Sequence, residues 1–358
     1  MGRAGRERHD VVVACIVPLR GPAGIYGPSC ESCIELAVEE INADGGLLGR
    51  PVTTVLVDGA APPQWVAREI DALITSGRID AVTGWHISPV RQAVAPVTFG
   101  RVPYTYAPLH EGHESTPGVF MTGETPRDQL LPAMDWMRAE YGIQRWILVG
   151  NDYVWPRLTA QAAREHARSA GRPLLGELYV PLGSENFEQI VDRIEASGAE
   201  GVLSLLVGDD GVRFNREFGA RRICDAIPRL SPHVEENMLL AGGPESNQGL
   251  YSAAGYFEGL NTTSGLEFAG RYYSRFGEGS PALNSIGESC YEAMILLAQL
   301  VRRARSLDVA DIIPSSEGLT YEGPRGVVRM IGQQLRQTVY VARADAVEFD
   351  IQAALTVA

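Results

Sequence analysis

The sequence predicts an α/β protein made of two similar lobes, each with a parallel-sheet core. Three observations lead to this fold class. The chain opens with a strand at Val11–Val17, a helix, and a second strand at Val52–Val57, and such β-α-β units form parallel sheets. Strand-like and helix-like segments then alternate along the chain in two runs. The length of 358 residues is long for one domain and comfortable for two.

The first helix and the turn after it complete the opening unit. Apolar residues recur at helical spacing from Cys30 to Ile41, which gives this helix one apolar face. The following segment has the sequence N-A-D-G-G-L-L-G-R-P-V, and Gly45 and Gly46 suit the left-handed positions that end a helix. The helix therefore leads directly into the second strand.

The later elements continue the alternation. Strands are predicted at 79–84, 103–107, 146–149, 174–180, 201–207 and 238–241, and helices at about 64–76, 89–99, 127–140, 156–170, 186–197, 210–221, 264–276 and 285–304. A hairpin-like tail is predicted at Gly326–Met330 and Val339–Ala342. No tandem repeat, low-complexity block or long linker interrupts the sequence, which fits two lobes joined by short crossings.

The charge balance argues against a nucleic-acid-binding protein. The chain has 44 acidic and 31 basic residues, for a formal net charge of −13. A surface that binds phosphates needs clustered basic side chains. Direct binding of nucleic acid is therefore not expected.

The cysteines and the N-terminus favour an intracellular protein. Five cysteines cannot form a complete disulfide framework, so Cys15, Cys224 and Cys290 are expected as free thiols. Cys30 and Cys33 form a C-x-x-C, but both lie on the apolar helix face and are expected in the core. No signal-peptide pattern precedes the first strand, so a cytoplasmic location is expected, or a periplasmic or extracellular one if a leader has been removed.

Two turns of the first run carry candidate ligand-binding residues. Ser88 is placed to cap a helix that begins at Pro89, where free N–H groups suit a ligand carbonyl or carboxylate, and Trp85 and His86 share this turn. A Ser-Pro helix start without any ligand remains the alternative. Tyr106 ends the next strand, two residues before Pro108. Packing under a helix is the alternative for that tyrosine.

The second run supplies four further candidates. Tyr153 and Trp155 follow a strand and are candidates for an aromatic wall over a ligand, with packing of the turn against its own lobe as the alternative. Asp209 follows the strand predicted at 201–207, and an acidic residue at a helix N-terminus is its alternative. Glu245 follows the strand predicted at 238–241.

Neither catalysis nor a metal is expected. The sequence has no G-x-S-x-G, Walker loop, H-E-x-x-H or strand-linked G-x-G-x-x-G, and no nucleophile–base constellation. The histidines near the candidate turns, His86, His110 and His113, match no metal-ligand spacing. No cofactor is expected either.

The opening segment also carries a family resemblance. A strand, the Gly21–Gly24 loop G-P-A-G, a helix and then N-A-D-G-G-L-L-G-R-P-V resemble the type I periplasmic-binding-protein family, in its branch of amino-acid, urea and amide binders. The resemblance implies two Rossmann-like lobes joined by a three-strand hinge, with the ligand cleft between them. It implies lobe boundaries at 1–122 plus 261–323 and at 123–260 plus 324–358, with crossings near Thr122–Gly123, Gly259–Thr262 and Gly323–Pro324.

The resemblance points to two different ligands. In the family a serine at the position of Ser88 contacts the ligand. The segment Gly150–Arg157 is similar to the G-x-D-Y-x-(aromatic)-P-R pattern of amide-sensing regulators, although Pro108 stands where those proteins usually have threonine. Glu245 in G-P-E instead matches the amino-acid-binding branch, where a glutamate pairs with the ligand ammonium.

The expected function is therefore a non-catalytic clamp for a short amide, urea or an amino acid. One interpretation is a cytoplasmic sensor similar to the negative regulator of aliphatic amidase expression, with an RNA-binding antiterminator protein as partner. The alternative is the substrate-binding component of an ABC transporter for branched-chain or other amino acids, urea or amides, with a permease as partner. The sequence leaves open a homo-oligomer.

Overall fold

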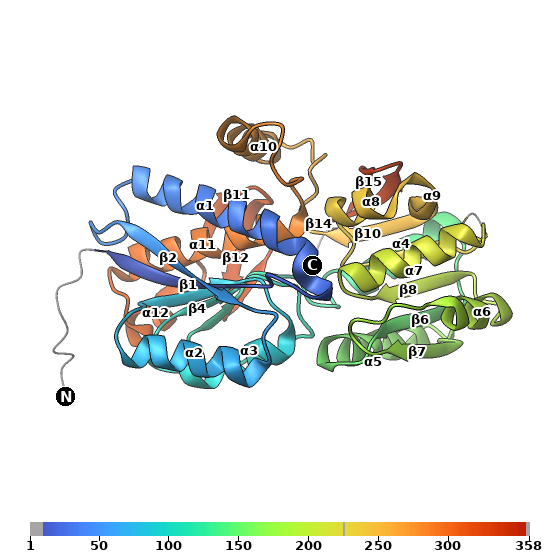
Figure 1. The fold of residues 1–358 in the computed structure, drawn as a ribbon, viewed down its shortest axis with the longest axis horizontal. Helices are drawn as coiled ribbons and strands as arrows, with labels where there is room; N and C mark the ends of the chain where they lie inside the picture. Colours follow the sequence, from blue (N-terminus) through green and yellow to red (C-terminus); the bar gives the residue numbers. More distant parts are fainter. Residues whose placement is uncertain (1–9, 225, 356–358) are drawn as a thin grey trace.

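The computed structural model describes residues 10–224 and 226–355. It has two α/β lobes side by side, each built on one sheet of mostly parallel strands (Figure 1). Lobe 1 is the unit around the sheet of order β11-β12-β13-β5-β4-β3-β1-β2, and lobe 2 is the unit around the sheet of order β15-β14-β10-β9-β8-β6-β7. The predicted two-lobed α/β class is confirmed.

Lobe 1 takes the first run of β-α units and a late helical segment. Its strands are β1 (Val11–Val17), β2 (Val52–Asp58), β3 (Ala81–Gly84), β4 (Tyr104–Tyr106), β5 (Val119–Met121), β11 (Thr320–Gly323), β12 (Gly326–Ile331) and β13 (Gln334–Arg336). Its helices are η1 (Pro22–Tyr26), α1 (Gly27–Ala43), α2 (Pro63–Thr75), α3 (Ser88–Thr98), α10 (Thr263–Phe276), α11 (Ser285–Ala304) and α12 (Val309–Ser316). Figure 1 shows α1 and α11 on one face of the sheet and α2 and α3 on the other.

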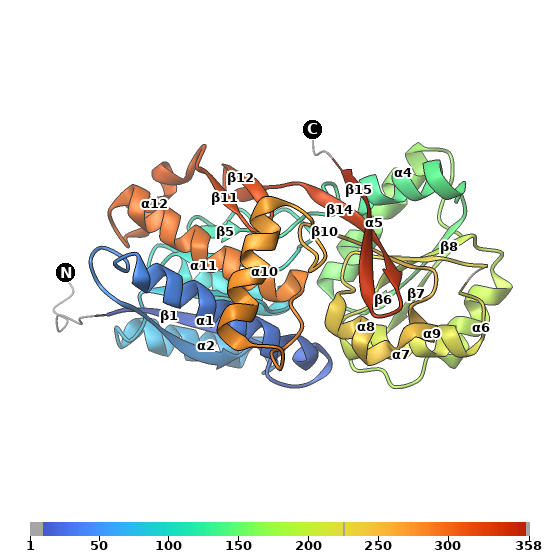
Figure 2. The same ribbon diagram turned by 90° about the horizontal axis from the view of Figure 1, so that it is seen from above.

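Lobe 2 takes the middle of the chain and the C-terminal strands. Its strands are β6 (Trp146–Asn151), β7 (Gly176–Val180), β8 (Gly201–Leu205), β9 (Arg229–Ser231), β10 (Leu250–Ala254), β14 (Val339–Asp345) and β15 (Glu348–Leu355). Its helices are α4 (Leu130–Tyr141), α5 (Val154–Ser169), α6 (Glu188–Ala196), α7 (Asp209–Ala220), α8 (Glu236–Gly242) and α9 (Pro244–Asn247). In Figure 2, α4 and α5 lie on one side of the sheet and α6 and α7 on the other.

The opening unit forms as its sequence predicts. The apolar face of α1, including Cys30, Cys33 and Ile41, is buried, and α1 packs against α11. The turn after α1 requires glycine at Gly46, because its φ is 74° and a Cβ there would lie 2.0 Å from the Arg50 carbonyl oxygen. The Asn42 side chain then joins helix to strand, accepting from Val52 N–H at 2.7 Å and donating to the Val52 carbonyl at 2.9 Å.

The predicted core placement of the cysteines is confirmed. All five are buried, and no disulfide joins them in the part of the chain that the structure describes. Burial raises the pKa of the Cys30 and Cys33 thiols well above the usual range, which leaves both protonated and unreactive.

Among the described residues, no helix combines the length and apolarity that a bilayer crossing requires.

Two predicted elements are wrong. Residues 238–241 form part of helix α8 rather than a strand, because a short apolar run fits either element and the Glu235 side chain caps a helix here. The segments Gly326–Met330 and Val339–Ala342 do not pair as a hairpin. β12 pairs with β11 and β13 in lobe 1, whereas β14 pairs with β10 and β15 in lobe 2 (Figure 2).

This pairing also moves one expected lobe boundary. Gly323–Pro324 lies in the turn between β11 and β12, inside lobe 1, and not at a crossing between lobes. The third crossing instead follows β13 and precedes β14, around Gln337. The tail assigned to the second lobe therefore begins about a dozen residues later than the expected 324.

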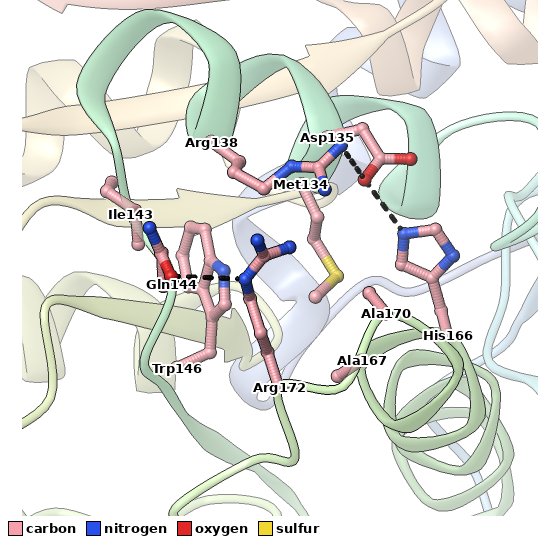
Figure 3. A pocket seen from close by; sticks show the side chains of 10 residues that line it. All are labelled: Met134, Asp135, Arg138, Ile143, Gln144, Trp146, His166, Ala167, Ala170 and Arg172. Carbon is pink, nitrogen blue, oxygen red and sulfur yellow. Dashed lines mark hydrogen bonds and ion pairs between the residues drawn. The ribbon is translucent and has the colours of Figure 1, made fainter.

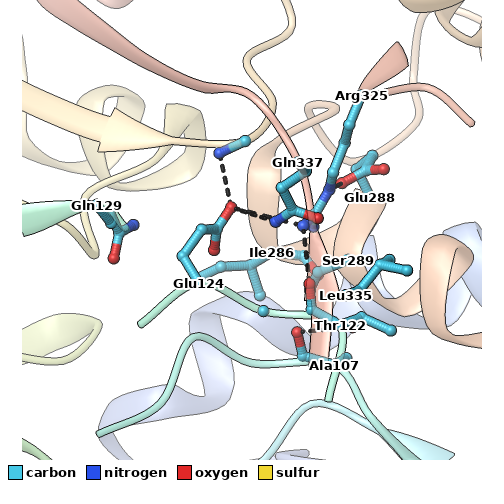
Figure 4. A network of polar contacts seen from close by, with 12 residues as sticks. Ala107, Thr122, Glu124, Gln129, Ile286, Glu288, Ser289, Arg325, Leu335 and Gln337 are labelled. Atoms are coloured by element: carbon cyan, nitrogen blue, oxygen red, sulfur yellow. Dashed lines mark hydrogen bonds and ion pairs between the residues drawn. The ribbon is translucent and has the colours of Figure 1, made fainter. Parts of the chain in front are cut away.

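One carboxylate oxygen joins the three crossings. Glu124 Oε1 accepts from Gly255 N–H at 2.8 Å on the second crossing and from Gln337 Nε2 at 2.8 Å on the third, while Glu124 itself lies on the first (Figure 4). Arg325 reaches the same oxygen at 3.5 Å and binds Glu288 at 2.6 Å. We call Glu124, Gly255, Gln337, Arg325 and Glu288 the hinge network.

Candidate functional site

The two lobes touch across the ends of their parallel strands. Tyr26 lies in η1 after β1 of lobe 1, and its hydroxyl accepts from Gly208 N–H at 2.6 Å, at the start of α7 in lobe 2. The same hydroxyl lies 2.9 Å from Nδ1 of His233, which follows β9. Because ligands of open α/β sheets bind at the carboxyl ends of strands, this closed contact marks the candidate site.

Aromatic rings from both lobes form the centre of the contact. Trp85 packs against Tyr26 at a ring-centroid distance of 4.9 Å and against His233 at 5.4 Å, and Trp155 packs against His233 at 5.3 Å. Tyr26, Trp85, Trp155 and His233, all buried, are called the aromatic cluster. Tyr153 flanks the cluster, with its ring 6.3 Å from that of Trp155.

The polar atoms of the cluster are uncharged at neutral pH. Burial lowers the pKa of His233 to about 4, so its imidazole is neutral. Burial, and then the nearby Glu235 carboxylate, raise the pKa of the Tyr26 hydroxyl well above its usual range. Since the Tyr26 oxygen accepts from Gly208, its own proton is available for His233 Nδ1.

Lobe 2 contributes polar atoms that no described residue satisfies. Glu235 follows β9 and is fully buried; its Oε2 accepts from Asn237 N–H at 3.1 Å, but its Oε1 has no partner among the described residues. Trp155 Nε1 is likewise buried without a partner in that part of the chain. Burial raises the pKa of Glu235 to about 8, although backbone N–H groups of Asn237 and Met238 oppose the shift. Glu235 is therefore mostly protonated at neutral pH.

Lobe 1 presents a polar wall whose groups are largely paired with one another. Ser88 Oγ donates to Glu111 Oε2 at 2.7 Å, and Arg91 Nη2 donates to Glu111 Oε1 at 2.7 Å. Arg91 also binds Glu114 at 2.9 Å and lies over the Tyr106 ring at 5.0 Å. Burial opposes ionisation of Glu111, but the Arg91 charge prevails and lowers the pKa of that carboxyl. This wall is an ion-pair network of one arginine and two glutamates, in which Arg91 Nη1 has no partner among the described residues.

Several predicted candidates lie around the contact. Trp85 and Trp155 belong to the aromatic cluster, and Tyr153 lies beside it. Ser88 and Tyr106 belong to the lobe 1 wall, where Tyr106 donates its hydroxyl proton to the His86 carbonyl at 2.8 Å. α3, which carries Ser88 and Arg91, contacts α5 of lobe 2, and Tyr153 directly precedes α5. Burial, and then the nearby Tyr106 and Glu111, raise the pKa of Tyr153.

His86 and Pro108 point elsewhere. The His86 ring lies inside lobe 1, with Nε2 2.5 Å from the Tyr104 hydroxyl and Nδ1 3.2 Å from the Ile16 carbonyl. Burial lowers its pKa to about 3, so it is a neutral core histidine. Pro108 is buried against the first crossing, since a Cβ on Gly123 would lie 2.0 Å from the Pro108 carbonyl oxygen.

Asp209 lies at the contact, whereas Glu245 does not. Asp209 is the half-buried first residue of α7, next to the Gly208 N–H that reaches Tyr26. Glu245 is exposed on the short helix α9 and precedes β10. Because β10 runs parallel to β9, the start of β10 lies at the sheet end away from the contact. The expected placement of Glu245 in the cleft is therefore wrong.

The sequence reasoning missed several residues that the fold brings to the site: Tyr26, Arg91, Glu111, His233 and Glu235. Tyr26 had a signal, because it ends the G-P-A-G-I-Y loop after the first strand. His233 and Glu235 follow β9, a three-residue strand with an arginine and a serine at its ends, so no apolar run indicated it. Glu235, ten residues before Glu245, places a carboxyl group at the contact where Glu245 does not.

A hollow inside lobe 2 is too small for a ligand. It lies between α4 and α5, where Asp135 binds both Arg138 and His166, as Figure 3 shows. Its volume is about 20 Å³, which accommodates about one water molecule. This hollow carries no candidate site.

Comparisons with known proteins agree with this architecture. The sequence profile of a family described as "Periplasmic binding protein" matches residues 10–348. The chain is 25% identical over 355 residues to "Leu/Ile/Val-binding protein homolog 6" of Brucella suis biovar 1 (strain 1330), in an alignment that covers 94% of this chain and 89% of that protein.

Solved structures show the same fold at lower identity. The solute binding protein of an ABC transporter from Rhodopseudomonas palustris BisB5, in complex with 3,4-dihydroxybenzoic acid, superimposes with a TM-score of 0.87 at 21% identity, over 97% of this chain and 98% of that one. The branched-chain amino acid transporter substrate binding protein LivJ from Streptococcus pneumoniae, in complex with isoleucine, gives a TM-score of 0.83 at 16% identity, over 96% and 98%.

Proposed function

The chain belongs to the periplasmic binding protein family, and from that premise we propose that it binds a small molecule carrying an amino group between its lobes. We further propose that it acts as the substrate-binding component of an ABC transporter. The observation that carries the ligand class is the fully buried Glu235, whose Oε1 has no partner among the described residues. An unpaired buried carboxyl is costly, and a bound ammonium would satisfy it.

The surroundings of Glu235 fit an ammonium better than an anion. The other acids near the contact, Glu111 and Glu114, both bind Arg91. The positive charge of Arg91 is therefore already balanced by two carboxylates before any ligand carboxylate approaches. The aromatic cluster adds ring faces, which attract cations electrostatically. Trp155 Nε1 is a second unpartnered group among the described residues, and as a donor it suits a ligand oxygen. An amino acid offers both an ammonium and oxygens.

Measured affinity would separate an amino acid from urea or a short amide. A ligand of about four heavy atoms reaches at most about −6 kcal/mol, or tens of micromolar, whereas an amino acid has more atoms and a charge pair. A ligand favours the closed form only through its extra affinity for that form. In the closed form, the Tyr26 hydroxyl of lobe 1 is hydrogen-bonded to Gly208 and His233 of lobe 2. A ligand that contacts both lobes would add to these hydrogen bonds.

The relatives favour transport over gene regulation. The similar proteins named above are a Leu/Ile/Val-binding protein homologue and two transporter binding proteins. None of these names supports closeness to the amide-sensing regulator. Permease and ATPase genes beside the coding gene would support the transporter role, whereas an antiterminator gene there would support the regulator.

Titration calorimetry tests the ligand class. The panel contains leucine, isoleucine, alanine, acetamide, urea and 3,4-dihydroxybenzoate, each titrated into the full chain. We expect heat from at least one amino acid, with an affinity above that of acetamide and urea. Tight binding of 3,4-dihydroxybenzoate with no heat from any amino acid would contradict the amino-group proposal.

A further inference from the structure

The hinge network connects the two lobes through a single oxygen, Glu124 Oε1. The Gly255 N–H that donates to this oxygen directly follows β10 of lobe 2, whereas Gln337 directly follows β13 of lobe 1 (Figure 4). Arg325, in the turn between β11 and β12, also belongs to lobe 1 and approaches the same oxygen to 3.5 Å. The oxygen therefore accepts from lobe 2 on one side and from lobe 1 on the other.

These contacts specify one angle between the lobes. Glu124 Oε1 accepts from Gly255 and Gln337 at 2.8 Å each only while these two donors lie close together, and rotation of the lobes changes their separation. Glu124 and Gln337 are buried, so a donor that loses this oxygen loses a hydrogen bond to a charged group away from water. The network is therefore satisfied in the closed arrangement.

Gly255 shows how closely the network packs. A Cβ at this position would lie 2.5 Å from Glu124 Oε1 and 3.2 Å from both Arg325 Cδ and Gln337 Nε2. The backbone itself does not require glycine here, because the φ of Gly255 is not positive. Glycine is therefore needed at 255 because side chains from the other two crossings and from lobe 1 converge on it.

The charge of Arg325 does not depend on Glu124 alone. Arg325 also binds Glu288 at 2.6 Å, and both residues belong to lobe 1. A variant without the Glu124 carboxylate still has a paired arginine, so we expect lobe 1 to fold. What such a variant loses is the connection between the Gly255 N–H of lobe 2 and the lobe 1 side of the hinge.

We propose that Glu124 is a positioning residue, which favours the closed arrangement of the lobes and thereby strengthens ligand binding without contacting the ligand. The effect on a ligand rests on the proposed function, whereas the effect on closure concerns the protein alone. A ligand that contacts both lobes binds the closed form, so its apparent affinity follows the population of that form.

Hydrogen exchange at the Gly208 amide tests the proposal without any ligand. This N–H donates to the Tyr26 hydroxyl of the other lobe, so its protection from exchange reports how often the lobes separate. In Glu124→Ala we expect Gly208 to exchange at least about tenfold faster, the effect of losing one hydrogen bond to a charged group. Gly255→Ala should act in the same direction, because it keeps every charge but displaces Glu124 Oε1.

Glu200→Ala is the matched control. Glu200 Oε2 accepts from the N–H of Gln144 at 2.9 Å and of Arg145 at 3.1 Å, so this carboxylate also joins two segments, but both lie in lobe 2. The variant should lower the melting temperature and leave Gly208 exchange unchanged. Equal acceleration in Glu200→Ala and Glu124→Ala would overturn the proposal, and so would Gly208 exchange in Glu124→Ala that is no faster than in the wild type.

Calorimetry with leucine separates this proposal from the proposed function. We expect leucine to bind Glu124→Ala at least about tenfold more weakly than the wild type, in proportion to the acceleration of Gly208 exchange. Faster exchange with unchanged leucine affinity would overturn the role of Glu124 in binding. No heat from any amino acid in the wild type, together with faster exchange in Glu124→Ala, would overturn the proposed function and support the role of Glu124 in closure.

Discussion

Across the contact between the lobes, lobe 1 presents Ser88, Arg91 and Glu111, and lobe 2 presents Trp155 and Glu235. The lobe 1 groups bind one another at 2.7 Å and leave only Arg91 Nη1 of the three without a partner, whereas on lobe 2 the acceptor Glu235 Oε1 and the donor Trp155 Nε1 both have no partner among the described residues. Groups already paired gain little from a ligand, and unpaired buried groups gain most. On the proposed function, lobe 2 therefore supplies most of the polar recognition, while lobe 1 supplies a wall whose charges are largely paired with one another.

The largest expected effect is at Glu235. Glu235→Gln keeps the shape of the side chain but removes the charge that would pair with an ammonium, so leucine affinity should fall at least about 100-fold by calorimetry. Glu236→Gln is the matched control, because Glu236 is the neighbouring buried acid; its Oε1 accepts from Glu258 N–H at 2.8 Å, and its Oε2, like Glu235 Oε1, has no partner among the described residues. Equal losses in the two variants would contradict the special role of Glu235.

Closure itself should be nearly as sensitive at Gly208. In Gly208→Ala the new Cβ would lie 2.0 Å from the Pro22 carbonyl oxygen of the other lobe, so the lobes cannot meet as they do here. Ligand affinity should fall about tenfold or more, and small-angle scattering should show no compaction on ligand addition. The control is Gly198→Ala, which also places alanine at a positive φ, 71°, but has no atom within 4 Å of the new Cβ. Compaction in Gly208→Ala would refute this prediction.

A smaller effect on binding is expected at Ser88. Ser88→Ala leaves Glu111 Oε2 without its hydroxyl donor, so the free energy of unfolding should fall by about 1.5–3 kcal/mol, the usual value for a hydrogen bond to a charged group. Ligand affinity should change less than about threefold, because the hydroxyl is already used within lobe 1. A loss of affinity as large as that of Glu235→Gln, measured beside thermal melts, would reverse the assignment of roles to the two walls.

The pH dependence of the stability of the ligand-free protein should report the protonation state of Glu235. The pKa of Glu235 is raised from 4.5 to about 8 on folding, so the stability that this carboxyl contributes is complete below about pH 4.5 and is lost as the pH rises through about 8. Denaturant melts of the wild type and of Glu235→Gln should therefore diverge over this range, the wild type losing stability relative to the variant. If the stabilities of the two proteins instead changed in parallel with pH, the raised pKa of Glu235 would be contradicted.

The sequence predicted helices and strands correctly where the apolar pattern extended over many residues. The strand Val11–Val17 and the helix 285–304 are confirmed at their predicted bounds, because each has an unbroken apolar pattern. β5 and β9 have three residues each, too few to show a period, and they take their conformation from the neighbouring strands. Because the sequence predicted a strand at 238–241, the carboxylate expected after a strand of the second lobe was assigned to Glu245 rather than to Glu235.

The site was only half predictable for a related reason. Trp85, Tyr153 and Trp155 lie in turns after recognisable strands, so their approach to the cleft followed from the fold class. Tyr26 meets His233 across more than two hundred residues of sequence, and Ser88 meets Glu111 through a loop that no short pattern describes. Such contacts depend on how the lobes close and on which polar groups satisfy each other, which local sequence does not encode.

Proton release on binding tests the central claim most directly. At pH 7 a carboxyl of pKa about 8 is mostly protonated, and an ammonium bound beside it would expel that proton. Leucine is titrated calorimetrically at pH 7 in phosphate and in Tris, whose ionisation enthalpies differ. The account predicts close to one proton released per ligand bound by the wild type. A binding enthalpy that is the same in both buffers would contradict it.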